Sequence, residues 1–193
     1  MPRRNYDHYC TVSRALEVVG DRWNLLVVRE LCAGPRRYSD LFADLPGIST
    51  DILAGRLKDL ERDGILTHRR SGPRSAATYE LTAAGAALRP VLEALSNWGT
   101  TLLGERRSTD AVRAHWFALP LGRMVADVVG EGAVTVHIGD TTWHYVIGAA
   151  GISHHDGPAR SSECEFRMSV REAAEIVSGE RELTDAVTAS PVE

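Results

Sequence analysis

The stretch Ser49-Thr-Asp-Ile-Leu-Ala-Gly-Arg-Leu-Lys-Asp-Leu-Glu-Arg-Asp-Gly64 has the pattern of a short amphipathic helix with a polar start and a glycine stop. Ser49 or Thr50 is suited to cap its N-terminus, because a side-chain oxygen there accepts a hydrogen bond from an unpaired amide of the first turn. Gly64 is suited to end the helix after about Arg62. The pattern therefore predicts a helix of three to four turns.

The two sides of this helix differ in chemistry. At ~100° per residue three residues fall within about 60° of one another and predict the buried stripe: Leu53, Leu57 and Leu60. The opposite side carries Asp51, Gly55, Lys58 and Arg62, with Ala54 at its margin. This side is slim at its N-terminal end and basic further along, as a helix entering the ~12 Å wide major groove requires. An ordinary surface helix can have the same distribution of residues on its helical wheel. The wheel alone therefore leaves open whether this helix enters DNA or only covers the protein surface.

The flanking segments favour the first interpretation. Helices are expected at Val12–Val19, Trp23–Leu31 and Tyr38–Leu45, and short strands at Ile65–Arg70 and Thr78–Leu81. Helix, turn, helix and two-stranded hairpin is the order of a winged helix-turn-helix domain. Its wing would present Arg69, Arg70 and Arg74 to the phosphates beside a read site.

Composition excludes several classes of protein. Apolar residues are 44% of the 193 residues and charged residues 25%, which is typical of a globular chain. No apolar run approaches the ~18 residues of a membrane helix, so we expect a soluble cytoplasmic protein that does not bind membranes. Lys58 is the one lysine and follows Leu57, which excludes a P-loop. The 3 cysteines are odd in number and widely spaced, which excludes a disulfide framework and a CxxC metal site. Unpaired cysteines fit a reducing compartment.

Charge divides the chain into two predicted domains. The net charge of −4 is the sum of +3 over residues 1–107 and −7 over residues 108–193. The polar stretch Gly104–Asp110 lies at this boundary. We therefore expect a DNA-binding and dimerisation domain at 1–107 and a different domain at 108–193. A weak gradient of charge along a solvated surface would give the same numbers and is the alternative.

Several spaced motifs resemble the HxlR-type transcriptional regulators. They are Cys10-Thr-Val-Ser-Arg-Ala-Leu, Val19-Gly-Asp-Arg-Trp-Asn-Leu-Leu-Val-Val-Arg-Glu-Leu31, Gly34-Pro-Arg-Arg-Tyr-Ser-Asp-Leu41, Leu45-Pro-Gly-Ile-Ser49, Leu53-Ala-Gly-Arg-Leu-Lys-Asp-Leu60, Asp63-Gly-Ile-Leu66, Tyr79-Glu-Leu-Thr-Ala-Ala-Gly85 and Leu95-Ser-Asn-Trp98. The resemblance covers about residues 10–103 and implies a homodimer on a near-palindromic operator. Three departures are Thr11 in place of a common proline, Gly20-Asp-Arg-Trp in place of Gly-Gly-Lys-Trp, and Thr78 in place of a frequent glutamate. None is expected to touch the groove helix.

The expected DNA contacts fall into two groups. Base reading is assigned to Thr50, Asp51, Ala54 and Lys58, with Arg56 added from the family pattern although the wheel sets it near the core. Phosphate contacts are assigned to Arg36, Arg37, Ser49, Arg69, Arg70 and Arg74.

Thr82–Leu102 resembles the family's dimerisation helix, with Pro90 expected to kink or delimit it. Small and apolar residues recur at steps of four, three, four and three, the spacing of paired helices: Leu88, Leu92, Leu95, Gly99 and Leu102. Val91 and Trp98 widen this face. Packing within one chain is the alternative.

Cys10 stands at a helix start near Arg14, at the place where some HxlR-like regulators carry a redox-sensing cysteine. Inert packing of this thiol is the other interpretation. Cys32 is expected in the core.

The second half predicts an α+β domain. Helical pieces over Ala111–Val129, joined at Leu119-Pro120, precede strands Ala133–Ile138, Thr142–Ile147, Ile152–Asp156 and Cys164–Met168, and Ser169 caps a last helix. We expect a small antiparallel sheet with helices on one face. The pattern weakly resembles sterol-carrier-protein-like domains, which usually add a final strand and helix. The resemblance implies a pocket for a hydrophobic small molecule, lined by Val136, Ile138, Trp143, Tyr145, Phe166 and Met168.

Histidines 137, 144, 154 and 155 fit no metal-ligand spacing, and no catalytic constellation stands out. We therefore expect no metal, cofactor or enzyme activity. The leading hypothesis is a ligand- or thiol-responsive DNA-binding repressor. The alternatives are a small-molecule or lipid-binding protein whose winged domain serves assembly only, and an enzyme using a C-terminal cleft.

Overall fold

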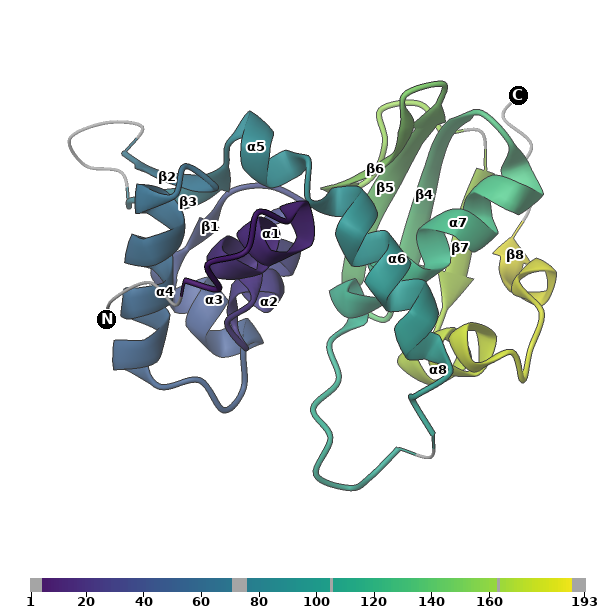
Figure 1. The fold of residues 1–193 in the computed structure, drawn as a ribbon. Coiled ribbons are helices and arrows are strands. Elements are labelled where there is room, and N and C mark those ends of the chain that lie inside the picture. The colour runs from purple at the N-terminus through teal and green to yellow at the C-terminus, as the bar shows by residue number, and fades with distance from the viewer. Residues whose placement is uncertain (1–4, 71–75, 105, 163, 189–193) are drawn as a thin grey trace. The chain divides into compact units, whose positions relative to one another are not determined.

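The computed structural model describes residues 5–70, 76–104, 106–162 and 164–188 (Figure 1). Contacts divide the chain into two units, Met1–Pro90 and Val91–Glu193. The division falls inside a helix and before the polar stretch Gly104–Asp110 that marked the boundary in the sequence. None of the described helices is long and apolar enough to span a bilayer.

The helices of the first unit follow the predicted order, and the ends of the first four lie within one residue of those expected. They are α1 Thr11–Val19, α2 Asn24–Leu31, α3 Tyr38–Asp44, α4 Thr50–Arg62 and α5 Ala83–Ala86. Their core contains Val27, Val28, Leu31 and Leu41 together with the leucine stripe of α4.

The wing sheet has three strands where two were predicted. β2 (Leu66–Arg69) and β3 (Thr78–Leu81) form the expected hairpin, and β1 (Arg36–Arg37) pairs antiparallel with the other edge of β3. The physical reason is that an isolated hairpin leaves edge amides and carbonyls unpaired, and the extended backbone between α2 and α3 satisfies them. The prediction of a two-stranded wing was therefore wrong.

The predicted helix Thr82–Leu102 is interrupted. α5 ends at Ala86 and α6 (Arg89–Thr100) begins after a turn, with Pro90 in its first turn as the second residue. Proline is tolerated there because the first amides of a helix have no intrahelical acceptor. Pro90 therefore delimits the helix, which was one of the two expected effects.

In the second unit, a 3-10 helix and α7 precede a sheet that is followed by α8. The elements are η1 Ala114–Phe117, α7 Ala118–Val129, β4 Gly132–Ile138, β5 Thr141–Gly148, β6 Gly151–Asp156, β7 Cys164–Met168, α8 Val170–Ser178, η2 Leu183–Ala186 and β8 Val187–Thr188. The two helical pieces meet at Phe117 and Ala118, slightly before the predicted joint, so Pro120 lies harmlessly in the first turn of α7.

The strand order is β6-β5-β4-β7-β8, and the sheet is mixed rather than antiparallel. β4, β5 and β6 form the predicted meander, but β7 runs parallel to β4. The reason is that the segment after β6 crosses the sheet: the Ala159 amide donates to Thr135 Oγ1 at 3.1 Å, and the Thr135 amide donates to Ser162 Oγ at 2.9 Å. β8 pairs with β7 and supplies a fifth strand.

One face of this sheet carries the core of the second unit. The six predicted pocket residues, which lie on β4, β5 and β7, are at most 7% exposed. They pack with Leu121 and Val125 of α7 and with Ala173 and Ile176 of α8, so the prediction of helices on one face is correct (Figure 1). Ser169 Oγ caps α8 by accepting from the Glu172 amide at 3.1 Å.

Candidate nucleic-acid interface

Helix α4 presents the face that its sequence predicts. Ser49 caps it, with its hydroxyl oxygen accepting from the Ile52 amide at 3.3 Å. The leucine stripe is at most 2% exposed: Leu53, Leu57 and Leu60. The predicted reading residues other than Arg56 are all exposed: Thr50, Asp51, Ala54 and Lys58. This side of α4 is therefore not covered by the described residues of its own unit.

Helix α3 fixes the start of α4. The Tyr38 hydroxyl donates to the Thr50 carbonyl at 3.0 Å, which joins the first residues of the two helices. Between them Leu45 and Ile48 are buried, and Gly47 has a φ of 90°. A left-handed backbone at this point favours glycine and makes the tight turn of a helix-turn-helix. The packing of α3 therefore determines where the N-terminus of α4 points.

The wing sheet places two predicted phosphate-binding arginines on one face. Thr78 of β3 pairs with Arg37 of β1 on one side and with Arg69 of β2 on the other. Residues directly opposite in an antiparallel ladder point to the same face, so Arg37, Thr78 and Arg69 form a row. Both arginines are exposed, although Arg69 Nε lies 2.8 Å from Glu80 Oε1.

The other predicted phosphate contacts are placed less uniformly. Arg70 is exposed after the end of β2, and Ser49 is exposed at the start of α4. Arg36 is partly buried and its neighbour in the ladder is Tyr79, so it points to the opposite face from Arg37. Arg74 lies outside the described residues.

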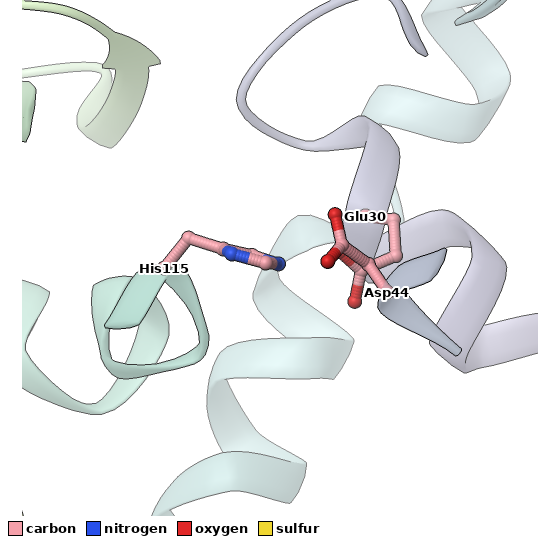
Figure 2. A group of neighbouring side chains, drawn as sticks. All are labelled: Glu30, Asp44 and His115. Atoms are coloured by element: carbon pink, nitrogen blue, oxygen red, sulfur yellow. The ribbon is translucent and has the colours of Figure 1, made fainter. Parts of the chain in front are cut away.

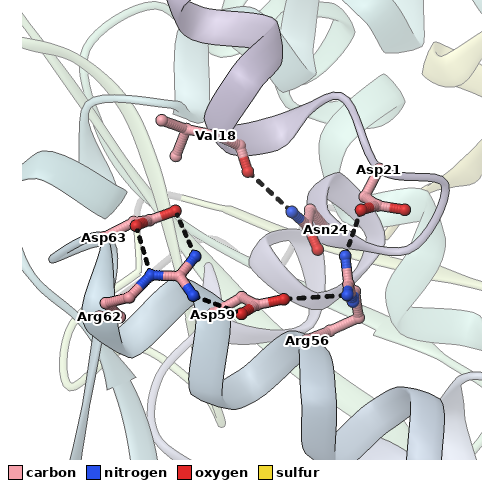
Figure 3. A network of polar contacts seen from close by, with 7 residues as sticks. All are labelled: Val18, Asp21, Asn24, Arg56, Asp59, Arg62 and Asp63. Carbon is pink, nitrogen blue, oxygen red and sulfur yellow. Dashed lines mark hydrogen bonds and ion pairs between the residues drawn. The ribbon is translucent and has the colours of Figure 1, made fainter. Parts of the chain in front are cut away.

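An ion-pair network joins α4 to the loop between α1 and α2 (Figure 3). Arg56 pairs with Asp21 of that loop and, through Nη2, with Asp59 Oδ2 at 2.9 Å. Arg62 pairs with the other oxygen of Asp59 at 2.8 Å and with Asp63 at 3.2 Å. The expectation that the Gly20-Asp-Arg-Trp departure does not touch the groove helix was wrong, because Asp21 reaches Arg56 across the fold.

Comparison with known proteins agrees with this geometry. Residues 18–107 match the HxlR-like helix-turn-helix family. A transcriptional regulator of Synechocystis sp., sll1512, is 37% identical over 50% of this chain and 72% of its own length. The Bacillus subtilis regulators YvaP and YodB are 37% and 36% identical over 45% and 44% of this chain, covering 82% and 76% of their lengths. The chain belongs to the HxlR-like family.

A solved structure of reduced YodB is 29% identical over 52% of this chain and 100% of its own, with a TM-score of 0.44. The HxlR-like match ends at residue 107.

Helix α6 of this HxlR-like protein carries an exposed apolar stripe. Val91, Leu95 and Trp98 are 49%, 45% and 64% exposed and recur at steps of four and three. Leu92 is 5% exposed and is therefore buried within the protomer rather than on this stripe. Leu88 lies in the turn before α6, and Leu102, which is 63% exposed, lies beyond its end.

The cysteines of this HxlR-like protein occupy three different environments. Cys10 is exposed at the N-cap of α1, Cys32 is buried as expected, and Cys164 is partly buried on β7. Hydrogen bonds from Ser13, first from its amide and then from its hydroxyl, lower the pKa of the Cys10 thiol. The amide of Val12 contributes in the same direction. Cys10 thus has the access and lowered pKa that a reactive thiol needs.

The six predicted pocket residues lie together in the core of the second unit. Val136, Ile138, Tyr145 and Phe166 are fully buried, and Trp143 and Met168 are 2% and 7% exposed. Tyr145 donates its hydroxyl to the Ala118 carbonyl at 2.7 Å, which joins β5 to α7. The structure therefore brings these residues into one packed cluster.

The histidines lie mainly on the opposite face of the sheet. His144 of β5 faces His155 of β6, with ring centroids 5.4 Å apart. The His144 Nδ1 lies 2.9 Å from the Gly157 carbonyl, and His137 Nδ1 lies 3.0 Å from Thr142 Oγ1. His144 is thereby satisfied at Nδ1, whereas the buried Nε2 of His137 has no hydrogen-bond partner among the described residues and lies 3.4 Å from Glu165 Oε2.

The first unit also contains a pair of neighbouring carboxylates, which sequence reasoning missed. Glu30 of α2 and Asp44 of α3 have oxygens within 4.8 Å of each other (Figure 2). Glu30 is 2% exposed, and Arg29 Nε donates to its Oε1 at 2.9 Å. Because the buried carboxylate is already paired with an arginine, we assign it to the packing of α2. The spacing in sequence contains no signal for this pair.

Proposed function

We propose that this protein is a sequence-specific repressor that binds a near-palindromic operator as a homodimer. In this proposal α4 enters the major groove and reads bases through Thr50, Asp51, Ala54 and Lys58. Arg37, Arg69, Arg70 and Ser49 contact the flanking phosphates. The observation that carries the proposal is the exposed, slim side of α4 opposite a fully buried leucine stripe.

Charge at this face also supports the proposal. Lys58 is exposed, and among the described residues of α4 it is the one cation for which the structure records no ion pair. An unpaired cation keeps its charge available for a base edge or a phosphate. Arg37 and Arg69 add a second basic row on the wing, which would hold the protein in register on the duplex.

Two kinds of signal are proposed to control binding. One is a hydrophobic small molecule in the second unit, in a sterol-carrier-protein-like site built around Trp143, Tyr145 and Phe166. This part of the proposal rests on the sequence resemblance, and the side chains it names lie together in the packed core of the second unit. The other is modification of Cys10, which its exposure supports.

The test compares Lys58→Gln and Arg37→Gln in binding to DNA upstream of the protein's own gene, over a range of salt concentrations. A base contact is worth ~1–3 kcal/mol, so Lys58→Gln is expected to weaken specific binding by roughly 5- to 160-fold for each half-site, while non-specific binding falls less. Arg37→Gln should weaken both and reduce the salt slope by about 1.8 in a dimer, since each phosphate contact contributes about 0.9.

Arg160→Gln is the matched control, because it removes an exposed arginine of the second unit. It should leave both affinities unchanged. Two outcomes would favour the small-molecule-binding alternative. One is normal operator binding by both test variants. The other is a wild-type protein that binds an apolar ligand but not the operator.

A further inference from the structure

Arg56 does not share the exposed face of α4. Its side chain is 18% exposed and its guanidinium lies between two carboxylates, those of Asp21 and Asp59 (Figure 3). A guanidinium engaged in this way has its charge compensated and its planar set of donors already directed at oxygen atoms of the protein. It is therefore poorly placed to bind a phosphate or a base edge.

The loop that carries Asp21 is anchored at both ends. The Gly20 amide donates to the Leu16 carbonyl at 2.9 Å, and the Asn24 amide donates to the Asp21 carbonyl at 3.0 Å. The Asn24 side chain, which is 3% exposed, donates through Nδ2 to the Val18 carbonyl at 2.7 Å. Asp21 thus projects from a segment that is fixed to the ends of α1 and α2.

We propose that Arg56 is a positioning residue that, with Asp21 and Asp59, sets the rotation of α4 about its own axis. This inference rests on the proposed function, because it concerns the face that α4 presents to DNA. A helix with side chains has a radius of ~5–6 Å, so a rotation of about 20° moves the outer side-chain tips by about 2 Å. Hydrogen bonds to base edges tolerate only a few tenths of an ångström. A tether at Arg56 therefore controls whether Lys58 and Ala54 meet their bases.

The sign of one substitution separates positioning from direct contact. Asp21 is 63% exposed and negative. If its charge merely repels DNA, or if it withholds Arg56 from DNA, Asp21→Asn will strengthen operator binding. If Asp21 holds α4 in its binding orientation through Arg56, the same substitution will weaken binding although it removes a negative charge.

The experiment measures operator affinity and its salt slope for Asp21→Asn, Arg56→Gln, Arg56→Lys and the double variant Asp21→Asn/Arg56→Gln in the full chain. We expect each single variant to weaken specific binding about three- to tenfold with an unchanged salt slope, and the double variant to equal the worse single one. Arg56→Lys should not restore binding, since an ammonium on a flexible stem cannot bridge both carboxylates as the fork does. Asp127→Asn, which removes a similarly exposed carboxylate from Arg123, is the control.

A second measurement needs no DNA. Hydrogen–deuterium exchange over Asp21–Asn24 and the first turns of α4 should be faster in Asp21→Asn and Arg56→Gln than in the wild type and in Asp127→Asn. Stronger operator binding by Asp21→Asn, additive effects in the double variant, or unchanged exchange would each overturn the positioning role. The proposed function fails separately, through the Lys58→Gln comparison.

Discussion

At the scale of a single residue, the local backbone shapes the environment of the Cys10 thiol. Cys10 is the N-cap of α1 with an extended backbone, beside amides of the first turn that have no intrahelical acceptor. These amides and the Ser13 hydroxyl stabilise the thiolate and lower the pKa of the thiol. Exposure and a lowered pKa are the properties of a reactive thiol, and of the three cysteines Cys10 is the exposed one.

At this scale we expect Cys10→Ser to abolish any loss of operator binding caused by oxidants or electrophiles, while binding of the untreated protein stays unchanged. Gel shift before and after oxidant treatment checks this. Cys32→Ser removes a buried thiol and should leave the response intact, provided that the variant folds. If oxidant still releases Cys10→Ser from the operator to the same extent, the redox hypothesis is wrong.

Helix α6 is the element whose surface is least explained by a single protomer. Large apolar side chains exposed at steps of four and three form a stripe, and such a stripe on a helix is typical of helix pairing. The homodimer proposal accounts for this stripe, with Trp98 as its largest side chain. Aromatic residues at the centre of interfaces contribute much of the binding free energy.

We expect Trp98→Asp to weaken the dimer by at least ~2 kcal/mol, which is about a 30-fold rise in its dissociation constant. Sedimentation equilibrium over a range of protein concentrations measures it. Val128→Asp, which alters an exposed valine on α7 that is 46% exposed, should leave the mass unchanged. A wild-type protein that sediments as a monomer would contradict the proposed dimer.

At the scale of the whole molecule, the two units have separate cores. Leu53 and Phe166 are both fully buried, one in each unit. Removing a large buried side chain leaves a cavity and costs ~2–5 kcal/mol for leucine and ~3–5 kcal/mol for phenylalanine. The expected consequence is that each truncation affects the unfolding of its own unit.

Differential scanning calorimetry should therefore show two unfolding transitions. Leu53→Ala should lower the midpoint temperature of one transition, and Phe166→Ala that of the other. Val146→Ala alters an exposed position on β5 and should change the free energy of unfolding of either unit by no more than about 0.5 kcal/mol. A single transition that both truncations lower equally would show that the units unfold as one.

Local patterns were sufficient for much of this protein. The boundaries of α4, its Ser49 cap, its leucine stripe and the inward residues of β4, β5 and β7 follow from periods of 3.6 and 2 and from capping chemistry, which depend only on neighbours in the chain. Three features required the tertiary structure: β1 on the edge of β3, β7 parallel to β4, and Arg56 held by Asp21. Each depends on segments far apart in sequence meeting in space, where unpaired backbone groups and charges find partners that no local pattern specifies.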